Sequence, residues 1–434
     1  MSIEKELMED GMKMKAFTGK KILILGGAAF HLKLIRAAQE LGAYTIVTDN
    51  LPVDRSPGKQ ISDRYWDINI YDIQGLTERC REEKVDGVIS GWLDPCQRPY
   101  AVLCKELGLP CYGTEEQFML MTDKIAFKQM CAKYGVDTIP DYSLEDAEAG
   151  TIEYPVFVKP NDSRGSRGQT VCYTKDELDK AIEEAKAESS NGKVIIEKYI
   201  SGSQEFHVTY FFVDGEPHLL RTSDNYCGSE ELNMQKVVSC AIMPSGYTKQ
   251  YMETAHPNVV RMFKALGIKN GPIFMQGFED NGVFRFFDPG LRFPGVDFEL
   301  VFKKVFGVDL MKAMIQIAFT GKTDAEIPSD AVWLKQKRGS VLYLTVKAGH
   351  IVEIIGENDV RSHENVVSYL PRCKNGDTVA WNYNVNQRLS EVDLLSETTD
   401  ELLESINYVN STVRALNDDG EDLVFARFDT DRVK

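Results

Sequence analysis

The sequence lacks the features of a secreted or membrane protein. Its nine cysteines are an odd number and form no C-x-x-C pair, so we expect reduced thiols rather than a disulfide framework. No segment has the uninterrupted apolar length of a membrane-spanning helix. Residues 1–20 are rich in Glu, Lys and Met and lack the apolar stretch of a signal peptide, so we interpret them as a short leader. These absences predict a cytoplasmic protein.

Motifs for several other classes of protein are also missing. A formal net charge of −16 repels polyanions, so neither nucleic acid nor an anionic membrane is an expected partner. The six histidines are too dispersed for a zinc motif, and the Gly-x-Ser-x-Gly motif of hydrolases is absent. Cys96, which we place at a strand end facing a cleft, has no evident general base. With 434 residues, of which 43% are hydrophobic, the chain has material for about two to four domains.

Residues 21–112 alternate between short apolar runs and helical patterns. The predicted strands are Lys21–Gly27 (KILILGG), Tyr44–Thr48 and Gly87–Ser90, and the predicted helices are His31–Leu41, Ile70–Glu83 and Pro99–Leu107. Strands that alternate with helices predict a doubly wound parallel sheet, which we expect to close near Tyr112.

Two glycines and an acid in this region invite a dinucleotide interpretation. Gly26 and Gly27 follow the first strand, and Asp49 ends the second at about the spacing of a ribose-binding acid. An NAD(P)-dependent oxidoreductase built on this domain is therefore one alternative. The full fingerprint is absent, because residues 26–31 are GGAAFH. We favour a Rossmann-like domain without a cofactor of its own.

A glycine-rich loop follows a short apolar strand in the middle of the chain. The strand Val156–Lys159 presents a lysine, and the loop Pro160–Gly168 is rich in Gly, Ser and Arg. Glycine permits the backbone conformations that turn several N–H groups toward phosphate oxygens. The loop is not a P-loop, because no G-K-[ST] opens a helix after it. Taken alone, the segment is explained about equally well as a surface hairpin.

Two further segments carry polar residues at the ends of predicted strands. Val194–Glu197 leads into Lys198-Tyr199-Ile200 and then Glu205, so backbone groups suit the edge of an adenine and Glu205 suits ribose hydroxyls. Gln276 and Asp288 lie on strands joined by the hairpin turn signal Asp280-Asn281-Gly282, and Arg292 follows. Oxygen ligands of this kind suit Mg²⁺ beside phosphates, and the arginine suits a carboxylate or acyl phosphate. Each segment alone is also compatible with an ordinary strand that ends at the surface.

Together, in this order and spacing, the three segments resemble the ATP-grasp superfamily, and most of all its carbamoyl-phosphate-synthetase-like and amino-acid-ligase-like members. The resemblance covers nearly the whole chain after the leader, and Lys347–Gly356 (KAGHIVEIIG) is similar to the C-terminal domain of amino acid ligases. It implies an α/β and α+β fold. A Rossmann-like parallel-sheet domain is expected at 21–112, an ATP-grasp core at 113–328 with a mobile lid at about 125–200, and a β-rich α+β domain at 329–434.

The resemblance also implies roles for individual residues. Lys159 and Arg292 would be catalytic, with Arg292 stabilising an acyl phosphate. Nucleotide-binding residues would be Lys124, Lys159, Ser163, Gly165, Ser166, Gly168, Glu197, Lys198, Tyr199, Ile200, Glu205 and Phe278. Gln276 and Asp288 would hold the metal. The implied cofactors are ATP and Mg²⁺, with Mn²⁺ as an alternative metal.

Two positions depart from the family pattern. Family members often have glutamate where this chain has Gln276, and asparagine where it has Gly290. Gln276 is a neutral and weaker ligand, and Gly290 offers no side chain, so a catalytically weakened ATP-binding regulatory protein is a second alternative. Glu279, Asp297 or Glu299 are candidates for a missing carboxylate.

The expected activity is an ADP-forming, ATP-dependent carboxylate–amine ligase, acting on an amino acid or another small carboxylate. The carboxylate would attack the γ-phosphoryl group and the resulting acyl phosphate would meet an amine, with bicarbonate, ammonia or a thiol as other nucleophiles. Specificity is expected between Asn225 and Tyr247 and after Arg292. The resemblance is compatible with a homodimer.

Overall fold

The N-terminal part of the chain forms a parallel sheet. The computed structural model describes residues 16–161, 168–228, 237–381 and 385–433. Four strands, β1 (Lys21–Leu25), β2 (Tyr44–Thr48), β3 (Arg64–Trp66) and β4 (Gly87–Ile89), pair in parallel in the order β3-β2-β1-β4. The predicted parallel sheet is confirmed. β3 was missed because it has three residues, two of them exposed, and so presents no apolar run.

Helices pack around this sheet and tie it to the rest of the molecule. They are α2 (Leu32–Glu40), α3 (Pro57–Ile61), α4 (Ile73–Glu83) and α5 (Asp94–Leu107). From much later in the sequence, α13 (Leu310–Thr320) packs against α2 and β4. Cys96 lies in the first turns of α5 and is 1% exposed, so its predicted place at a strand end facing a cleft is wrong.

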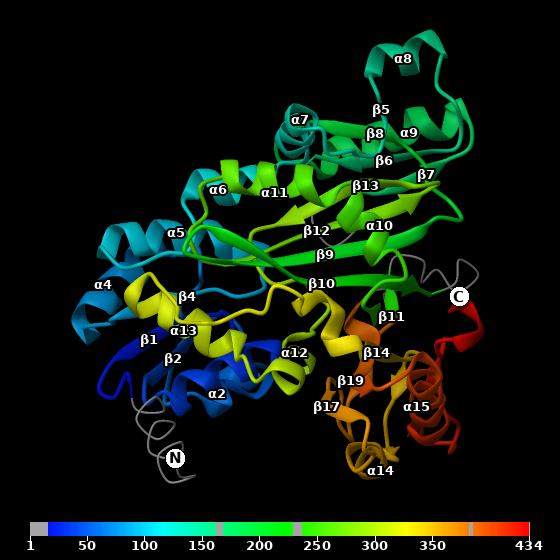
Figure 1. The fold of residues 1–434 in the computed structure, drawn as a ribbon. Coiled ribbons are helices and arrows are strands. Elements are labelled where there is room, and N and C mark those ends of the chain that lie inside the picture. The colour runs from blue at the N-terminus through cyan, green and yellow to red at the C-terminus, as the bar shows by residue number, and fades with distance from the viewer. Residues whose placement is uncertain (1–15, 162–167, 229–236, 382–384, 434) are drawn as a thin grey trace.

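A nine-stranded antiparallel sheet crosses the centre of the molecule (Figure 1). Its strands are β9 (Gln204–Val213), β10 (Glu216–Cys227), β11 (Val238–Met243), β12 (Gly271–Asp280), β13 (Val283–Gly290), β14 (Arg338–Val346), β17 (Val366–Pro371), β19 (Arg388–Ser396) and β21 (Val424–Phe425). The order is β13-β12-β9-β10-β11-β14-β19-β17, with β21 on β14. The predicted β12–β13 hairpin turns at Asn281 and Gly282, whose φ values are 52° and 91°, as a tight primed turn requires.

This sheet continues through the predicted boundary between residues 328 and 329. β14 pairs with β11, with Ala241 opposite Val341, and β19 and β17 extend the sheet beyond it. The β-rich, mixed α/β fold class is confirmed, but the chain on the two sides of residue 328 shares one sheet. The predicted limits of the domains stay a prediction.

The lid region has a sheet and a hydrophobic core of its own. β5 (Asp141–Tyr142), β6 (Val156–Pro160), β7 (Thr170–Cys172) and β8 (Val194–Lys198) pair in the order β5-β8-β6-β7, with α8 (Leu144–Ala149) and α9 (Lys175–Glu188) beside them. Their buried side chains form a cluster separate from the main core. In Figure 1 the lid sheet lies beyond β13, at the far side of the central sheet from β1 and β2.

Two stretches with a helical sequence pattern are each divided into two elements in the structure. The stretch Glu115–Tyr134 is two helices, α6 (Glu115–Leu120) and α7 (Lys124–Tyr134), because the side chain of Asp123 caps a new helix. The stretch Thr398–Leu416 is α15 (Thr399–Thr412) followed by the short strand β20 (Arg414–Leu416).

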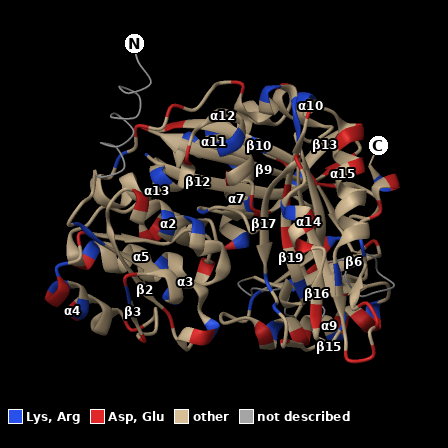
Figure 2. Cartoon of the chain, turned by 90° about the horizontal axis from the view of Figure 1, so that it is seen from below, with Lys and Arg blue, Asp and Glu red and all other residues tan. Residues whose placement is uncertain are grey.

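The remaining elements complete the two ends of the central sheet. They are α10 (Thr248–Glu253), α11 (His256–Ala265), α12 (Glu299–Phe306), α14 (Glu357–Arg361), β15 (Gly349–His350), β16 (Glu353–Ile355) and β18 (Thr378–Val379), with 3₁₀ turns at Ala29–His31, Val53–Arg55, Ala331–Gln336, Val385–Gln387 and Thr430–Arg432. Across the part of the chain that the structure describes, no helix is long and apolar enough to cross a membrane. Figure 2 shows that basic and acidic positions are both spread over many of the helices and strands.

Candidate active site

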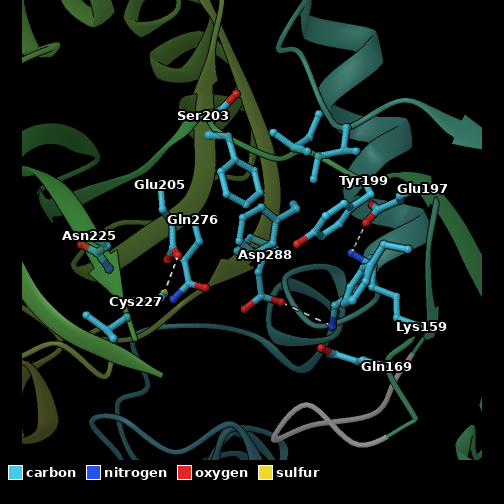
Figure 3. A pocket seen from close by; sticks show the side chains of 18 of the residues that line it. Lys159, Gln169, Glu197, Tyr199, Ser203, Glu205, Asn225, Cys227, Gln276 and Asp288 are labelled. Carbon is cyan, nitrogen blue, oxygen red and sulfur yellow. Dashed lines mark hydrogen bonds and ion pairs between the residues drawn. The ribbon is translucent and has the colours of Figure 1, made fainter. Parts of the chain in front are cut away.

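A large cavity lies between the lid sheet and the central sheet. Its volume is about 780 Å³, and its walls come from β6, β8, the start of α7 and strands β9, β10, β12 and β13. Figure 3 shows Lys159 and Glu197 on the lid side, with Gln276 and Asp288 on the facing strands. The cavity is therefore built from segments that lie far apart in the sequence, from Asp94 to Arg432.

Lys159 is buried in the lid wall beside an acid. Its Nζ lies 2.7 Å from Glu197 Oε2, and the Nζ of Lys128 lies 2.6 Å from Glu197 Oε1. The pairing follows from the sheet, in which β6 and β8 are neighbouring strands and Phe157 stands opposite Glu197. Lys159 lies two residues after Phe157, so its side chain is on the same face of the sheet as the side chain of Glu197. Burial lowers the pKa of Lys159, and the Glu197 carboxylate opposes that effect. Burial also opposes ionisation of Glu197, but Lys159 and Lys128 hold the pKa of this carboxyl below its usual value.

Lys124 enters the cavity from the first position of α7. The cap residue Asp123 accepts hydrogen bonds from the N–H groups of Ile125 and Ala126, each at 3.0 Å, which fixes the start of the helix. The Nζ of Lys124 lies 3.4 Å from Oδ1 of Asp288. Lys124, Lys159 and Asp288 were predicted to converge on one cleft, and all three line this cavity.

The predicted metal ligands stand side by side on two strands. Gln276 on β12 is directly opposite Asp288 on β13, and both line the cavity. Mg²⁺ commonly takes one or two carboxylates, with phosphate oxygens and waters completing its shell. One carboxylate and one amide oxygen fit that pattern beside a nucleotide. Among the described residues no group of three or more His, Cys, Asp or Glu side chains has a metal-binding arrangement.

The acids suggested as a replacement carboxylate have other partners. Asp297 and Glu299 both bind the Nζ of Lys33, at 2.9 and 2.6 Å. Glu279 accepts a hydrogen bond of 2.7 Å from the Gly282 N–H and so stabilises the β12–β13 turn. None of these three acids lines the cavity, so the suggestion is wrong for the structure as it stands.

Part of the cavity has an apolar lining that suits a nucleobase. Phe278 and Phe287 lie with ring centroids 5.2 Å apart, and Tyr199 and Ile200 also line the cavity. The N–H groups of Lys198 and Tyr199 donate to the carbonyls of Pro140 and Pro155, at 2.9 and 3.1 Å. These two N–H groups are therefore not directed at an adenine. The prediction that the backbone binds the edge of an adenine then applies only to the other backbone groups of this segment.

Glu205 belongs to a hydrogen-bonded chain that the sequence did not reveal. Its Oε1 lies 2.8 Å from His207 Nε2, and its Oε2 accepts from the Cys227 thiol at 3.2 Å. Asn225 Nδ2 lies 3.1 Å from His207 Nε2. Burial lowers the pKa of His207 although Glu205 opposes the effect, so the imidazole is neutral near pH 7. Asn225 and Cys227 line the cavity within the region where specificity was expected.

Arg292 lines the cavity and is held by an acid from the N-terminal part of the chain. Its Nε and Nη2 donate to Oδ1 and Oδ2 of Asp94 at 2.5 and 2.8 Å, and Nη1 donates to the Phe293 carbonyl at 2.9 Å. Burial disfavours the charged guanidinium, but Asp94 raises its pKa above the ordinary value. No local pattern in the sequence connects Asp94 with Arg292.

Three of the predicted loop residues, Ser163, Gly165 and Ser166, lie outside the described residues. Gly168 has φ +65°, and a Cβ there would lie 2.9 Å from Pro160 Cγ, so this position favours glycine. The other predicted site residues line the one cavity: Lys124, Lys159, Glu197, Lys198, Tyr199, Ile200, Glu205, Gln276, Phe278, Asp288 and Arg292. Their separate roles stay predictions.

The glycine turn of the N-terminal sheet is filled by the chain itself. A Cβ on Gly27 would lie 2.1 Å from Ser56 Oγ, and the Gly58 N–H donates to the Gly27 carbonyl at 2.7 Å. Asp49 accepts from Ser56 Oγ at 2.7 Å and lies 3.0 Å from Lys59 Nζ. The residues that suggested a dinucleotide site are therefore used in internal contacts, which favours a Rossmann-like domain without its own cofactor.

Comparison with known proteins identifies relatives of this chain. The 2-oxoglutarate carboxylase small subunit of Hydrogenobacter thermophilus is 26% identical over 320 residues, which are 69% of this chain and 66% of that protein. The biotin carboxylase domain dimer of the same carboxylase, solved with MgADP, ADP and bicarbonate, has a TM-score of 0.73 at 19% identity over 89% of each chain.

A solved amino acid ligase shares the fold over almost its full length. The L-amino acid ligase of Bacillus licheniformis has a TM-score of 0.72 at 16% identity, and the match covers 92% of this chain and 99% of the ligase chain. Residues 123–325 match the family model described as the ATP-binding domain of the carbamoyl-phosphate synthase L chain. This segment of the chain is therefore similar to that ATP-binding domain, as the ATP-grasp resemblance implied.

Proposed function

We propose that this protein is an ATP-dependent ligase that activates a small carboxylate as an acyl phosphate and joins it to an amine. The observation that carries the proposal is the convergence of Lys124, Lys159, Asp288 and Arg292 on one cavity. Two lysines and an acid beside the apolar lining suit a nucleoside triphosphate. An arginine in the same cavity suits the anion that the reaction forms.

The phosphate end of the cavity supplies fixed positive charge. Lys159 comes from the lid and Lys124 from a helix N-terminus, where the helix dipole adds to its charge. Asp288 and Gln276 would hold Mg²⁺, which would neutralise charge that develops on the transferred phosphoryl group. Lys124 balances the Asp288 carboxylate when no cation is bound, because the two groups are 3.4 Å apart.

The lid is suited to closing over the reaction. Its hydrophobic core is separate from the main core, so the lid can rotate as a unit without opening the packing of the central sheet. Closure would exclude water, which otherwise hydrolyses an acyl phosphate. The Lys159–Glu197 pair moves with the lid, because both residues lie on lid strands.

The acceptor end of the cavity contains Asp94, Asn225, Cys227, Arg292 and Arg432. Arg292 would stabilise the oxyanion as the amine attacks and phosphate leaves. An amino acid or another small carboxylate fits these charges, and bicarbonate, ammonia or a thiol are alternative partners. The solved relative that contains MgADP was described as a dimer. We extend that assembly to this chain, and a solution mass of twice 48.9 kDa in light scattering would test it.

The test combines nucleotide binding with turnover. Wild type should release phosphate from MgATP only with a suitable member of a panel of amino acids and small carboxylates. Arg292→Ala should lower that release by about 10²–10³-fold while calorimetry finds nearly unchanged MgATP binding. Arg98→Ala removes an exposed arginine that pairs with Glu115 and is the matched control. Full turnover in Arg292→Ala would overturn the role of this arginine.

A regulatory ATP-binding protein is the second candidate, and the metal site favours it. Only one carboxylate, Asp288, stands with Gln276 at the predicted metal position in the described chain. This candidate predicts tight MgATP binding without ADP formation for any carboxylate or amine in the panel. Carboxylate-dependent ADP release would reject it.

A further inference from the structure

The segment that carries Arg292 is held by the N-terminal part of the chain on both sides. The Gln97 amide donates to the Leu291 carbonyl at 3.4 Å, and the Phe293 N–H donates to the Gly91 carbonyl at 3.1 Å. The indole of Trp92 stacks on the Phe293 ring with centroids 5.6 Å apart. The loop after β4 and the start of α5 therefore fix this segment on both sides of Arg292.

The same loop fixes the arginine side chain itself. Asp94 takes one N–H from Nε and one from Nη2, and the Phe293 carbonyl takes one from Nη1. A guanidinium has five N–H groups, so two remain, one on each terminal nitrogen. The aromatic ring of Phe274 lies 4.8 Å from the guanidinium carbon and limits its tilt. The side chain is 12% exposed and lines the cavity.

We propose that Asp94 is a positioning residue of the ligase reaction, which turns the two remaining N–H groups of Arg292 toward the acyl-phosphate oxygens. This inference rests on the proposed function. Its physical basis is that a bidentate carboxylate fixes both the direction and the rotation of a planar guanidinium. The N-terminal part of the chain thereby contributes to the ATP-dependent site.

A second acid also acts on this arginine. Asp288 attracts Arg292 electrostatically and lies on the adjoining strand β13. The acid that the guanidinium contacts directly is Asp94, at 2.5 and 2.8 Å, so the bidentate pair sets the orientation of Arg292.

A cycle of variants tests whether Asp94 acts through Arg292. Phosphate release from MgATP would be measured with the carboxylate panel for wild type, Asp94→Asn, Arg292→Ala and the double variant. Asp94→Asn should lower kcat/KM for the carboxylate by about 10–100-fold and leave KM for ATP within about twofold. In the Arg292→Ala background the same change should have almost no further effect, because the side chain that Asp94 orients is absent.

The control is Glu115→Gln, which removes an acid from the exposed Arg98 pair near the same helix. It should leave kcat/KM unchanged, and Asp94→Glu should recover part of the activity of Asp94→Asn. An undiminished loss in the Arg292→Ala background would overturn the inference. So would wild-type kinetics in Asp94→Asn.

A spectroscopic readout separates this inference from the proposed function. With ¹⁵N-arginine labelling, the Arg292 Nε–H signal would be assigned by its loss in Arg292→Lys. Asp94→Asn should shift that signal and speed its exchange with water by at least about tenfold, because a charge-assisted hydrogen bond is lost. An unchanged signal overturns the inference. Wild type that shows the signal but turns over no carboxylate overturns the proposed function, and with it any role of Asp94 in ligation.

Discussion

At the scale of single residues, Glu197 joins the fold of the lid to the chemistry of the cavity. It is 1% exposed and is neutralised by Lys159 and Lys128. A buried carboxylate without such partners would be strongly destabilising. When phosphates arrive at Lys159, Lys128 remains as the partner of Glu197, so Lys159 can share its charge with the nucleotide.

Replacement of Lys159 tests this arrangement. Lys159→Ala should weaken MgATP binding by about ten- to a hundredfold, because a hydrogen bond to a charged group contributes about 1.5–3 kcal/mol. Titration calorimetry measures the change. Lys180→Ala removes an exposed lysine on the lid helix α9 and should leave the affinity unchanged. Equal affinities for the two variants would remove Lys159 from the phosphate site.

Substitution of Gln276 tests the metal site by adding a charged ligand instead of removing one. Gln276→Glu places a second carboxylate opposite Asp288 and should lower the Mg²⁺ concentration needed for half-maximal turnover several-fold. Asp288→Asn should raise it, because the remaining ligands are neutral. A Mg²⁺ requirement that both variants leave unchanged would place the cation elsewhere.

At the scale of elements, the β12–β13 hairpin decides which residues the site can contain. β13 is the edge strand of the central sheet, which allows Pro289 to lie in it without losing a ladder hydrogen bond to a neighbour. A Cβ on Gly290 would lie 2.3 Å from Cε1 of Phe274, a ring that is 1% exposed. The asparagine that family members often have at this position therefore does not fit here without movement of Phe274.

Gly290→Ala should lower the free energy of unfolding by about 1–3 kcal/mol, the usual cost of overpacking a core. Gly295→Ala is the control, because a Cβ there has no heavy atom within 4 Å, and its effect should stay within about 0.5 kcal/mol. Urea denaturation measures both. Equal stability of the two variants would mean that Phe274 gives way easily and that Gly290 is not required by packing.

At the scale of the whole molecule, a buried cluster of charges joins three distant parts of the chain. Lys33 comes from α2, Asp297 and Glu299 from the segment that opens α12, and Glu391 from β19. Burial and the neighbouring Asp297 raise the pKa of Glu391 to about 8, against the opposing effect of Arg372. The folded protein therefore keeps a proton that the unfolded chain releases near its ordinary pKa of 4.5.

This proton links stability to pH with a definite sign. Between pH 4.5 and 8 Glu391 binds more protons in the folded state than in the unfolded state, so the stability that it contributes falls as the pH rises and levels off above that window. The contribution of Glu391 is at most about 1.4 kcal/mol for each pH unit. Glu391→Gln should reduce the slope of the free energy of unfolding against pH between pH 6 and 8. Urea denaturation repeated at intervals of ~0.5 pH unit measures this slope. The exposed Glu404→Gln should keep the wild-type slope, and an equal slope in Glu391→Gln would refute the linkage.

The sequence alone determined much of the fold and the family resemblance. Apolar runs predicted β1, β2 and β4, a glycine-rich turn predicted the β12–β13 hairpin, and the order of lysine, loop and acid pointed to an ATP-grasp protein. These features are local, since each depends on hydrophobic period or turn chemistry within a few residues. β3 was missed because its three residues carry no such local pattern.

Only the tertiary structure decided which groups meet. The sequence places Asp94 and Arg292 almost two hundred residues apart, yet their side chains are joined at 2.5 Å. It offered Asp297 and Glu299 as metal ligands, but packing assigns both to Lys33. Such pairings depend on how whole layers pack, and burial then selects the one partner that neutralises each charge. Local patterns therefore fixed the elements of this protein, and long-range packing fixed the partners of its charged side chains.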